Sequence, residues 1–377
     1  MRGQLGMGTE RRDVDCHGLV RGVDLEPPRC AMRTCSATGE NPLVEICEAE
    51  AVEIQVLIDN VTDPVSSTSE IVTSEWDVLR ETGMSLLSGA CQCCANHGLS
   101  VRVRARFDST WHTVLFDSGP AEASFAYNVE RLKCDLSAVD AVVLSHGHWD
   151  HAGGLLKAIQ LIRDSAPGRS PVPLHMHPGV FVQRGITRRL GGVLPVKPVA
   201  SVAELSSAGA EPMLSVEEAF LIDGAFYLSG EIPRLTTFER GLAGHVRRSD
   251  DGESWLPDPQ IMDEKYLLVS VKGLGLLVVS ACSHAGIINV VRDVRTRFPD
   301  TPVYGVLGGL HLTGANEAII PETVDALAEL DLKLIAPGHC TGWRAVTALT
   351  NRLGDKVVMP TAVGQIFTLQ SAGAGTF

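Results

Sequence analysis

The sequence lacks an excess of basic charge, because 45 acidic residues outnumber 32 basic ones and the formal net charge is −13. Nucleic-acid-binding proteins normally carry clustered Lys and Arg that neutralise backbone phosphates. We therefore expect no DNA or RNA partner. The local basic clusters 184–189 and 240–248 are more typical of a solvated surface, although either could bind one small anion.

Long apolar runs are also lacking. The longest, such as Leu274–Val279, have the length of a strand and fall short of the roughly 18 residues needed to span a bilayer. The N-terminus has no apolar signal-peptide core, and its Arg residues are interleaved with acidic residues, which argues against a transit peptide. We therefore expect no membrane partner and a cytoplasmic location.

The ten cysteines lack the paired rhythm of a disulfide framework, which is typical of a reducing compartment. Free thiols are the simplest interpretation. Soft-metal binding by the cluster Cys91, Cys93 and Cys94 is a weaker alternative, because no second Cys or His pair follows at zinc-finger spacing. The role of these cysteines stays open. A content of 45% hydrophobic and 20% charged residues predicts a compact globular protein.

The composition changes along the chain. Residues 1–48 mix Arg, Gly, Cys and Pro without a sustained period, so we predict a poorly ordered N-terminal extension. Residues 49–377 are predicted to form one domain with inserted segments at about 61–96 and 191–225. Pro, Gly and Ser punctuate the second insertion, which we expect at the surface near the substrate opening.

Apolar periodicity within that domain predicts two halves, each with paired strands followed by alternating strands and helices. This order predicts a mixed α/β (α+β) fold with a two-sheet core flanked by helices. The predicted strands are 52–58, 101–107, 113–116, 141–144, 172–177, 266–271, 275–280, 303–306 and 334–336, and the predicted helices are 154–163, 287–298 and 321–330.

The strongest chemical signal directly follows the strand 141–144, where the chain reads SHGHWDHAGG. His146, His148, Asp150 and His151 crowd three imidazoles and one carboxylate into this loop. A sharp loop at a strand end can direct alternate side chains toward two metal ions. We predict that His146 and His148 face one ion while Asp150 and His151 face the other. A surface His-rich loop without metal is the weaker alternative.

This H-x-H-x-D-H segment, set between a strand and a helix, resembles the signature of the metallo-β-lactamase superfamily. The resemblance covers about residue 52 to the end of the chain. It implies a four-layer αββα metallo-β-lactamase sandwich with two divalent metal ions at the sheet edge. We expect zinc, with manganese or iron as alternatives, because His/Asp sites accept all three metals.

Later strand ends supply further candidates. Where the superfamily usually places a bridging Asp, this chain has none, so we predict His284 as a metal ligand and Cys282 as the second choice or a buried small hydrophobe. His339 resembles the terminal ligand histidine. His311 would project at the same edge as a proton donor or ligand, unless it is a packed core residue. Asp117 matches the carboxylate that braces the metal loop.

Six segments narrow the resemblance to a dihydropteroate-synthase-like branch of the superfamily. This branch implies a transferase that condenses a dihydropterin diphosphate with an arylamine, forming a C–N bond and releasing diphosphate. The extension before residue 50 and the long segment 61–94 leave the identity of the reaction open. The six segments are NHGLS at 96–100, LFDSG at 115–119, SGEIPR at 229–234, CSHAG at 282–286, GGLHL at 308–312 and GHCTG at 338–342.

We predict a metal-dependent hydrolase in which a metal-bound water or hydroxide attacks a small anionic substrate, with Asp150 and His311 as catalytic residues. The substrate would be phosphorylated or pterin-like, and His97, Arg234 and Arg240 are candidates to bind it. His97 has a surface or packing role as an equal alternative. Pterin transfer is the second function, and a non-catalytic, metal-dependent ligand-binding protein is the third. The sequence does not indicate an oligomeric state.

Overall fold

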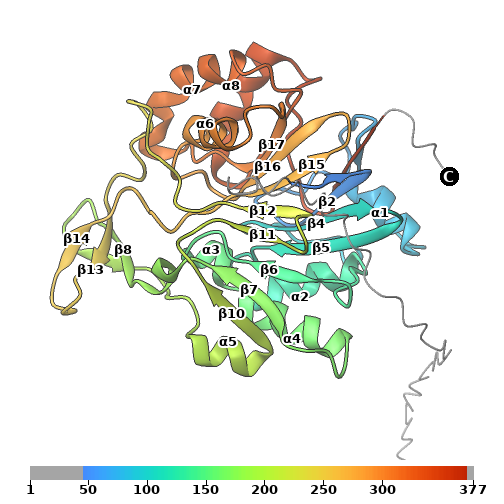
Figure 1. Ribbon diagram of the computed structural model, residues 1–377, viewed down its shortest axis with the longest axis horizontal. Helices are drawn as coiled ribbons and strands as arrows, with labels where there is room; N and C mark the ends of the chain where they lie inside the picture. The colour runs from blue at the N-terminus through green and yellow to red at the C-terminus, as the bar shows by residue number, and fades with distance from the viewer. Residues whose placement is uncertain (1–45, 372–377) are drawn as a thin grey trace, which may run out of the picture.

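The chain folds into four layers: two sheets pack against each other in the middle, and helices cover the outer face of each sheet (Figure 1). The computed structural model describes residues 46–371. The predicted mixed α/β class and the αββα sandwich are confirmed. The predicted extension 1–48 lies outside the described residues except for 46–48, and strand β1 (Glu48–Ala49) begins within it.

The first sheet has eight strands in the order β10-β7-β6-β5-β4-β2-β19-β3. Strands β5, β6 and β7 run parallel, so their carboxyl ends lie at one edge of the sheet. The bounds are β2 (Ala51–Ile58), β3 (Val72–Thr73), β4 (Ser100–Phe107), β5 (Thr110–Phe116), β6 (Ala141–Val143), β7 (Val172–Met176), β10 (Ala210–Leu214) and β19 (Ile366–Gln370).

The second sheet has the order β11-β12-β15-β16-β17-β18, with β1 beside β15. Strands β16, β17 and β18 are parallel, so their carboxyl ends also share one edge. The bounds are β11 (Ala219–Leu221), β12 (Phe226–Leu228), β15 (Leu267–Val271), β16 (Gly275–Ser280), β17 (Val303–Gly309) and β18 (Leu334–Gly338).

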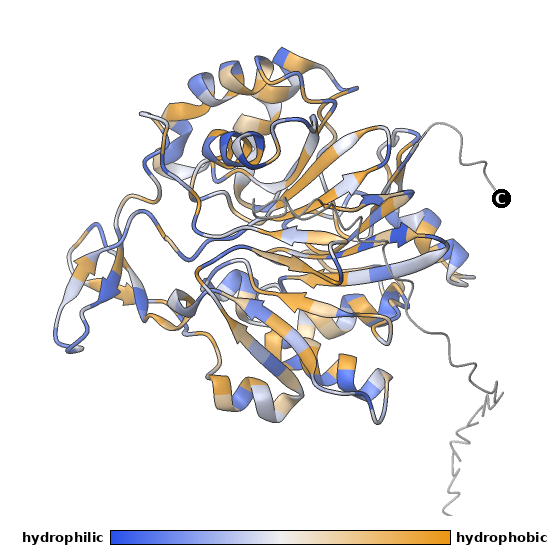
Figure 2. Cartoon of the chain, in the orientation of Figure 1, coloured by the Kyte–Doolittle hydropathy of each residue, from blue (hydrophilic) through white to orange (hydrophobic). Residues whose placement is uncertain are grey.

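Apolar side chains hold the layers together. On β4, Val101, Val103 and Ala105 are fully buried between the sheets, while the alternate Arg102 and Arg104 reach the surface. This period of two is what a half-buried strand requires. Each fully buried Val contributes about 1.5–3 kcal/mol relative to an exposed one. The apolar colours in Figure 2 accordingly gather between the layers.

Helices cover both outer faces of the sandwich (Figure 1). Apolar residues of α2 (Glu122–Arg131), α4 (Leu155–Ser165) and α5 (Val202–Ala208) pack on the eight-stranded sheet. Those of α6 (Ile287–Arg297), α7 (Ile320–Ala328) and α8 (Trp343–Leu353) pack on the other. No helix within residues 46–371 is both long and apolar enough to cross a membrane.

A small four-stranded sheet projects from the side of the sandwich (Figure 1). We call it the arm. It consists of β8 (Arg184–Thr187), β9 (Val193–Pro195), β13 (His245–Arg248) and β14 (Trp255–Pro257). Because β13 pairs with β8, the arm joins two segments that are far apart in the sequence.

The two segments predicted as insertions contain regular structure. The segment 191–225 contributes β9 to the arm, and α5, β10 and β11 to the sandwich. The segment 61–96 contains β3 and α1 (Glu75–Glu81). The sequence patterns did not predict α2, α8, β19 or the arm.

Candidate metal centre

The site lies where the carboxyl ends of parallel strands from both sheets meet. The chain turns sharply there: Asp117, Ser283, His311 and His339 adopt left-handed φ angles of 60°, 55°, 43° and 46°. Such a conformation costs a non-glycine residue about 1–3 kcal/mol and persists only where surrounding contacts enforce it. These turns bring side chains from separate strand ends together.

Hydrogen bonds fix which nitrogen of His146 carries a proton. Ser145 Oγ donates to the Asp117 carboxylate over 2.7 Å, so the same oxygen accepts from His146 Nδ1 over 2.9 Å. The Nε2 atom of His146 is therefore unprotonated. It lies 3.0 Å from Nδ1 of His148.

The proton of His148 is fixed in the same way by His245 of the arm. His245 Nδ1 lies 2.7 Å from the carbonyl oxygen of Asp258, which can only accept, so Nδ1 is the protonated nitrogen. His245 Nε2 then accepts from His148 Nε2 over 2.9 Å. Nδ1 of His148 is left without a proton.

Two unprotonated nitrogens, His146 Nε2 and His148 Nδ1, consequently face each other at 3.0 Å. No hydrogen bond can join them, because neither can donate. Two imidazole nitrogens bound to one tetrahedral zinc ion at about 2.0–2.1 Å would be separated by about 3.3 Å. The pair therefore fits a shared cation.

His284 completes a triad with His146 and His148, whose ligand atoms all lie within 4.8 Å of one another. Its backbone is held by the buried Glu264 carboxylate, which accepts from His284 N over 2.8 Å and from Ala285 N over 2.7 Å. Both ring nitrogens are buried without a hydrogen-bond partner. Because buried polar atoms are nearly always satisfied, these orphaned nitrogens also fit a metal ligand.

Burial favours the neutral form of all three rings. It holds the pKa values of His146, His148 and His284 well below the ordinary value. A neutral imidazole is the form that binds metal.

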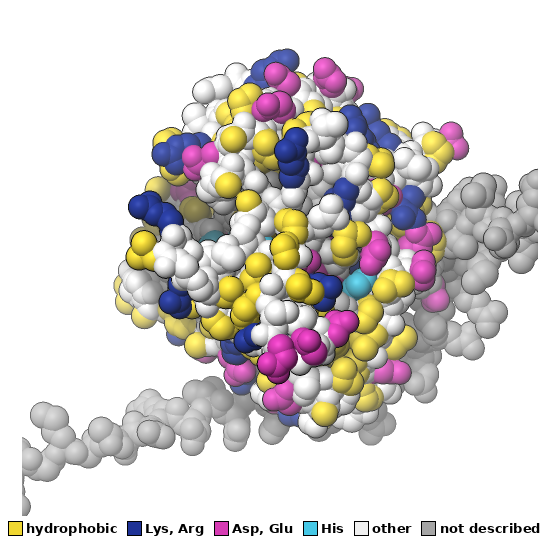
Figure 3. Space-filling model, turned by 90° about the vertical axis from the view of Figure 1, so that its left-hand side faces the viewer, with side chains coloured by type: hydrophobic (Ala, Val, Ile, Leu, Met, Phe, Trp, Pro, Cys, Tyr) yellow, Lys and Arg dark blue, Asp and Glu magenta, His cyan; other side chains and the backbone are white. Residues whose placement is uncertain are grey.

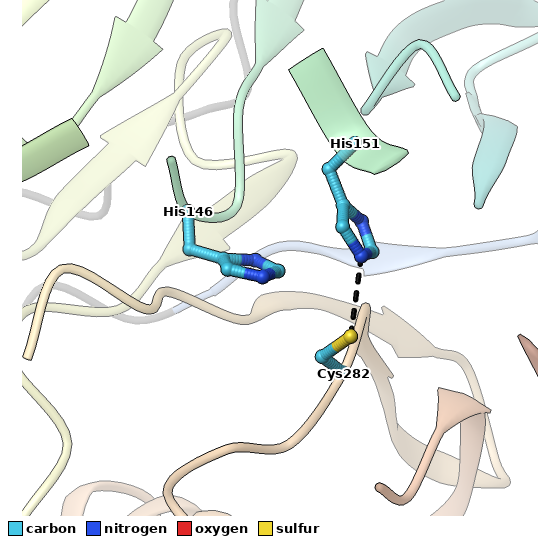
Figure 4. Close-up of side chains that lie close together, drawn as sticks. All are labelled: His146, His151 and Cys282. Carbon is cyan, nitrogen blue, oxygen red and sulfur yellow. Dashed lines mark hydrogen bonds between the residues drawn. The ribbon is translucent and has the colours of Figure 1, made fainter. Parts of the chain in front are cut away.

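A second cluster contains Asp150 and His151. His151 Nδ1 donates to Asp117 over 2.7 Å, which leaves Nε2 at 4.0 Å from Asp150 Oδ1 and 3.1 Å from Cys282 Sγ. Figure 4 shows the side chains of His146, His151 and Cys282 close together, although Cys282 is remote in sequence from the segment 146–151 that carries both histidines. Burial opposes a charge on His151, but the carboxylates of Asp150 and Asp117 outweigh it and raise the pKa to about 9. These carboxylates favour a positive charge here, either a proton or a metal ion.

Asn60 orients the other residues of this cluster. Its Oδ1 accepts from Gly98 N and from His339 Nδ1, each over 3.1 Å, so Nε2 of His339 is unprotonated and lies 3.5 Å from Asp150 Oδ2. Its Nδ2 donates to His97 Nδ1 over 3.1 Å, which directs His97 Nε2 toward Asp150 at 3.4 Å. Although burial alone would raise the pKa of Asp150, these imidazoles and His151 hold it below its ordinary range. Burial lowers the pKa of His339 to about 4.

Buried contacts support the loop that carries His146, His148 and His151. Gly147 N donates to Asp263 Oδ2 over 2.8 Å, and the buried Arg184 pairs with both oxygens of Asp263. A Cβ atom on Gly153 would lie 1.9 Å from the carbonyl oxygen of Pro120. Only glycine fits at that close approach.

Comparison with known proteins agrees with this geometry. Residues 108–211 match the metallo-beta-lactamase superfamily. The 7,8-dihydropterin-6-methyl-4-(beta-D-ribofuranosyl)-aminobenzene-5'-phosphate synthase of Methanocaldococcus jannaschii is 30% identical over 256 residues, which cover 67% of this chain and 83% of the relative. The chain belongs to the metallo-beta-lactamase superfamily.

The chain is also similar to two further proteins. An uncharacterized protein of the same organism is 30% identical over 256 residues, covering 68% of this chain and 88% of that protein. A solved structure of Tm1679, described as a metal-dependent hydrolase of the beta-lactamase superfamily, has a TM-score of 0.61 at 24% identity and covers 85% of this chain and 99% of that chain. The structural similarity shows the shared fold.

The remaining candidate residues from the sequence lie at different places. The His311 ring is 4.3 Å from that of His284, measured between centroids. Arg240 lines a small pocket with these two histidines, and a histidine side chain is visible in a recess in Figure 3. The Arg234 guanidinium instead donates to backbone carbonyls, including that of Gln260. Within residues 46–371, none of the candidate metal-binding groups contains Cys91, Cys93 or Cys94.

Three residues of the site were missed by the sequence analysis. His245 gave no signal, because it is a lone histidine outside the superfamily motif. Asn60 gave a weak one, as a polar residue directly after the first predicted strand. Cys340 adjoins His339 and could have been noticed as a second potential ligand at that strand end.

Proposed function

We propose that this protein is an enzyme with a centre for two divalent metal ions, acting on a small anionic substrate. The observation that supports this most directly is the pair of unprotonated nitrogens of His146 and His148 at 3.0 Å. With His284 they would hold one ion. Asp150, with its neighbours His151 and His339, would hold the other.

Two ions bound there would polarise an electrophilic carbon or phosphorus and make water a stronger nucleophile. Neighbouring side chains orient the proposed metal ligands. Asp117 orients His151, and His245 orients His148. His97, whose side chain is 54% exposed, lies at the rim against Asp150 and is placed to meet the substrate.

The small pocket beside the first triad offers one cationic side chain to an anionic substrate. Glu239 also lines this pocket, but its carboxylate accepts hydrogen bonds from the backbone N–H groups of Ile288 and Asn289. Arg240 and His311 line it together with His284. An Arg guanidinium forms strong, directional hydrogen bonds with phosphate oxygens. We assign Arg240 to substrate binding. Arg234 instead braces the backbone at Ile232 and Gln260 through its carbonyl contacts.

Hydrolysis is the simplest reaction for this centre, because water is the nucleophile and no second organic substrate is needed. Pterin transfer is a second candidate, supported by the 30% identity to the synthase of Methanocaldococcus jannaschii. There an arylamine would attack and diphosphate would leave. Both reactions would use the same metal ligands, so only the identity of the substrate distinguishes hydrolysis from transfer. Turnover of any substrate would exclude a non-catalytic ligand-binding protein.

The test combines metal content with turnover. The full chain, His148→Ala and the control His112→Ala are reconstituted and measured by elemental mass spectrometry. The control removes a histidine on β5 that pairs with Asp140 at 3.7 Å. A panel of a phosphodiester, a lactone, and a dihydropterin diphosphate with an arylamine follows on the same samples.

We expect at least two equivalents of metal in the wild type and in the control, with metal and turnover reduced together in His148→Ala. Turnover of the phosphodiester or lactone would identify a hydrolase, and consumption of the pterin pair a transferase. A reconstituted wild type that binds no metal would overturn the proposal.

A further inference from the structure

A second group of soft ligands adjoins the paired centre. Cys282 follows β16, His311 follows β17 and Cys340 follows β18. One ligand atom from each lies within 4.8 Å of the other two. The parallel strand ends therefore gather two thiols and one imidazole at a single point.

The two sulfur atoms have the spacing of metal ligands. Cys282 Sγ and Cys340 Sγ are 3.4 Å apart, and both residues are buried. A disulfide requires about 2.05 Å. Two thiolates on one tetrahedral zinc ion, each at about 2.3 Å, are separated by about 3.8 Å. The separation excludes a disulfide. It is compatible with the thiol–thiol hydrogen bond from Cys340 to Cys282 in the metal-free protein and, after a small movement, with a shared ion.

An unpartnered nitrogen points to a ligand at this position, and a glycine makes room for one of the sulfur atoms. Nδ1 of His311 is buried without a hydrogen-bond partner. A Cβ atom on Gly309 would lie 2.6 Å from Cys340 Sγ, so this glycine leaves the room that the sulfur occupies. Among the other cysteines of residues 46–371, none belongs to a candidate metal-binding group.

We propose that Cys282, His311 and Cys340 form a third metal position, selective for zinc or another thiophilic divalent ion. Two cysteines and one histidine with an open fourth position form a known type of catalytic zinc site. Thiolates disfavour magnesium and manganese. Each thiol gives up its proton to the solvent when its sulfur bonds to the ion.

Cys282 links this position to the paired centre. Its sulfur also lies 3.1 Å from His151 Nε2 and groups with His146 and His151. As a thiolate it would bridge the third position and the centre. The ion bound by Cys340 and His311 would then lie beside the pocket that Arg240 lines.

Cobalt(II) provides the test, because thiolate ligation gives a near-ultraviolet charge-transfer band that imidazole and carboxylate ligands do not give. The full chain, kept reduced with a phosphine, is stripped of metal and titrated with cobalt. We expect the band in the wild type, a clearly weaker band in Cys340→Ser, and none in Cys282→Ser/Cys340→Ser, since the intensity follows the number of bonds between cobalt and thiolate. Cys134→Ser is the matched control, since Cys134 is a buried thiol in another cluster.

Absence of the band in the wild type, or an undiminished band in Cys340→Ser, would overturn the proposal. If Cys340→Ser does not fold, His311→Gln keeps both thiols and should bind one equivalent of cobalt less than the wild type. Unchanged cobalt binding by that variant would also overturn it. In His148→Ala the cobalt of the histidine triad should be reduced while the thiolate band remains, so this proposal and the proposed enzyme can fail separately.

Discussion

Nε2 of His148 lies 2.9 Å from Nε2 of His245, a residue of the arm that is 97 positions away in the sequence. Because His245 Nδ1 donates to the Asp258 carbonyl, this contact fixes both the proton and the orientation of the His148 ring. The arm therefore supports a proposed metal ligand through a chain of two hydrogen bonds. Partners of this kind tune metal affinity in other metalloenzymes.

His245→Ala should lower metal affinity about 10–100-fold, as the loss of such an orienting partner typically does. The reason is that His148 would be free to rotate or to protonate Nδ1. Competition with a chelator of known affinity measures the change. His112→Ala should keep wild-type affinity, and an equal affinity in His245→Ala would contradict the positioning role.

Arg184→Ala should lower the free energy of unfolding by about 3–5 kcal/mol, because it leaves the buried Asp263 carboxylate without its cation. The ion pair is close, with Arg184 Nη2 at 2.6 Å from Asp263 Oδ1. Urea unfolding in the presence of a chelator separates this effect from metal binding. Arg344→Ala, which breaks an exposed pair with Glu317, should cost about 0–1 kcal/mol. Similar costs for both variants would contradict the prediction.

Gly153→Ala should destabilise the loop that carries the proposed metal ligands by about 3 kcal/mol, the upper end of typical overpacking costs. Its Cβ would lie 1.9 Å from the Pro120 carbonyl oxygen and 2.7 Å from that of Trp149, and backbone atoms cannot easily move away. Thermal unfolding and metal content report the effect. Gly89→Ala is the control, because a Cβ there meets no atom within 4 Å. A harmless Gly153→Ala would show that this loop is less closely packed than its geometry indicates.

Lys265 should make stability depend on pH. It is buried, donates to the carbonyl oxygens of Glu217 and Ser229, and burial lowers its pKa from 10.5 to about 8. Between these values the unfolded chain holds a proton that the folded chain has lost, so stability rises with pH.

The free energy of unfolding of the wild type, relative to Lys265→Met, should therefore increase as the pH rises from about 8 to about 10.5. Urea unfolding of both proteins across this range measures it, and the difference cancels the titration of other groups. A difference that stays constant with pH would show that Lys265 keeps its ordinary pKa.

The sequence by itself determined the elements that depend on local pattern. Apolar runs gave β6, β16, β17 and β18, because burial on both faces requires continuous apolar residues. His146, His148, Asp150 and His151 follow β6 directly, so their proximity needs only a short loop. The resemblance of this motif then predicted the four-layer fold.

Only the tertiary structure decided the rest, because it depends on contacts between residues remote in the chain. The protons of His146 and His148 are placed by Asp117 and His245, whose positions follow from sheet order and from the pairing of β13 with β8. Cys282 and Cys340 meet because parallel strands end at one edge of a sheet. Sequence spacing carries no record of such pairings, because they depend on which strands become neighbours in the folded chain.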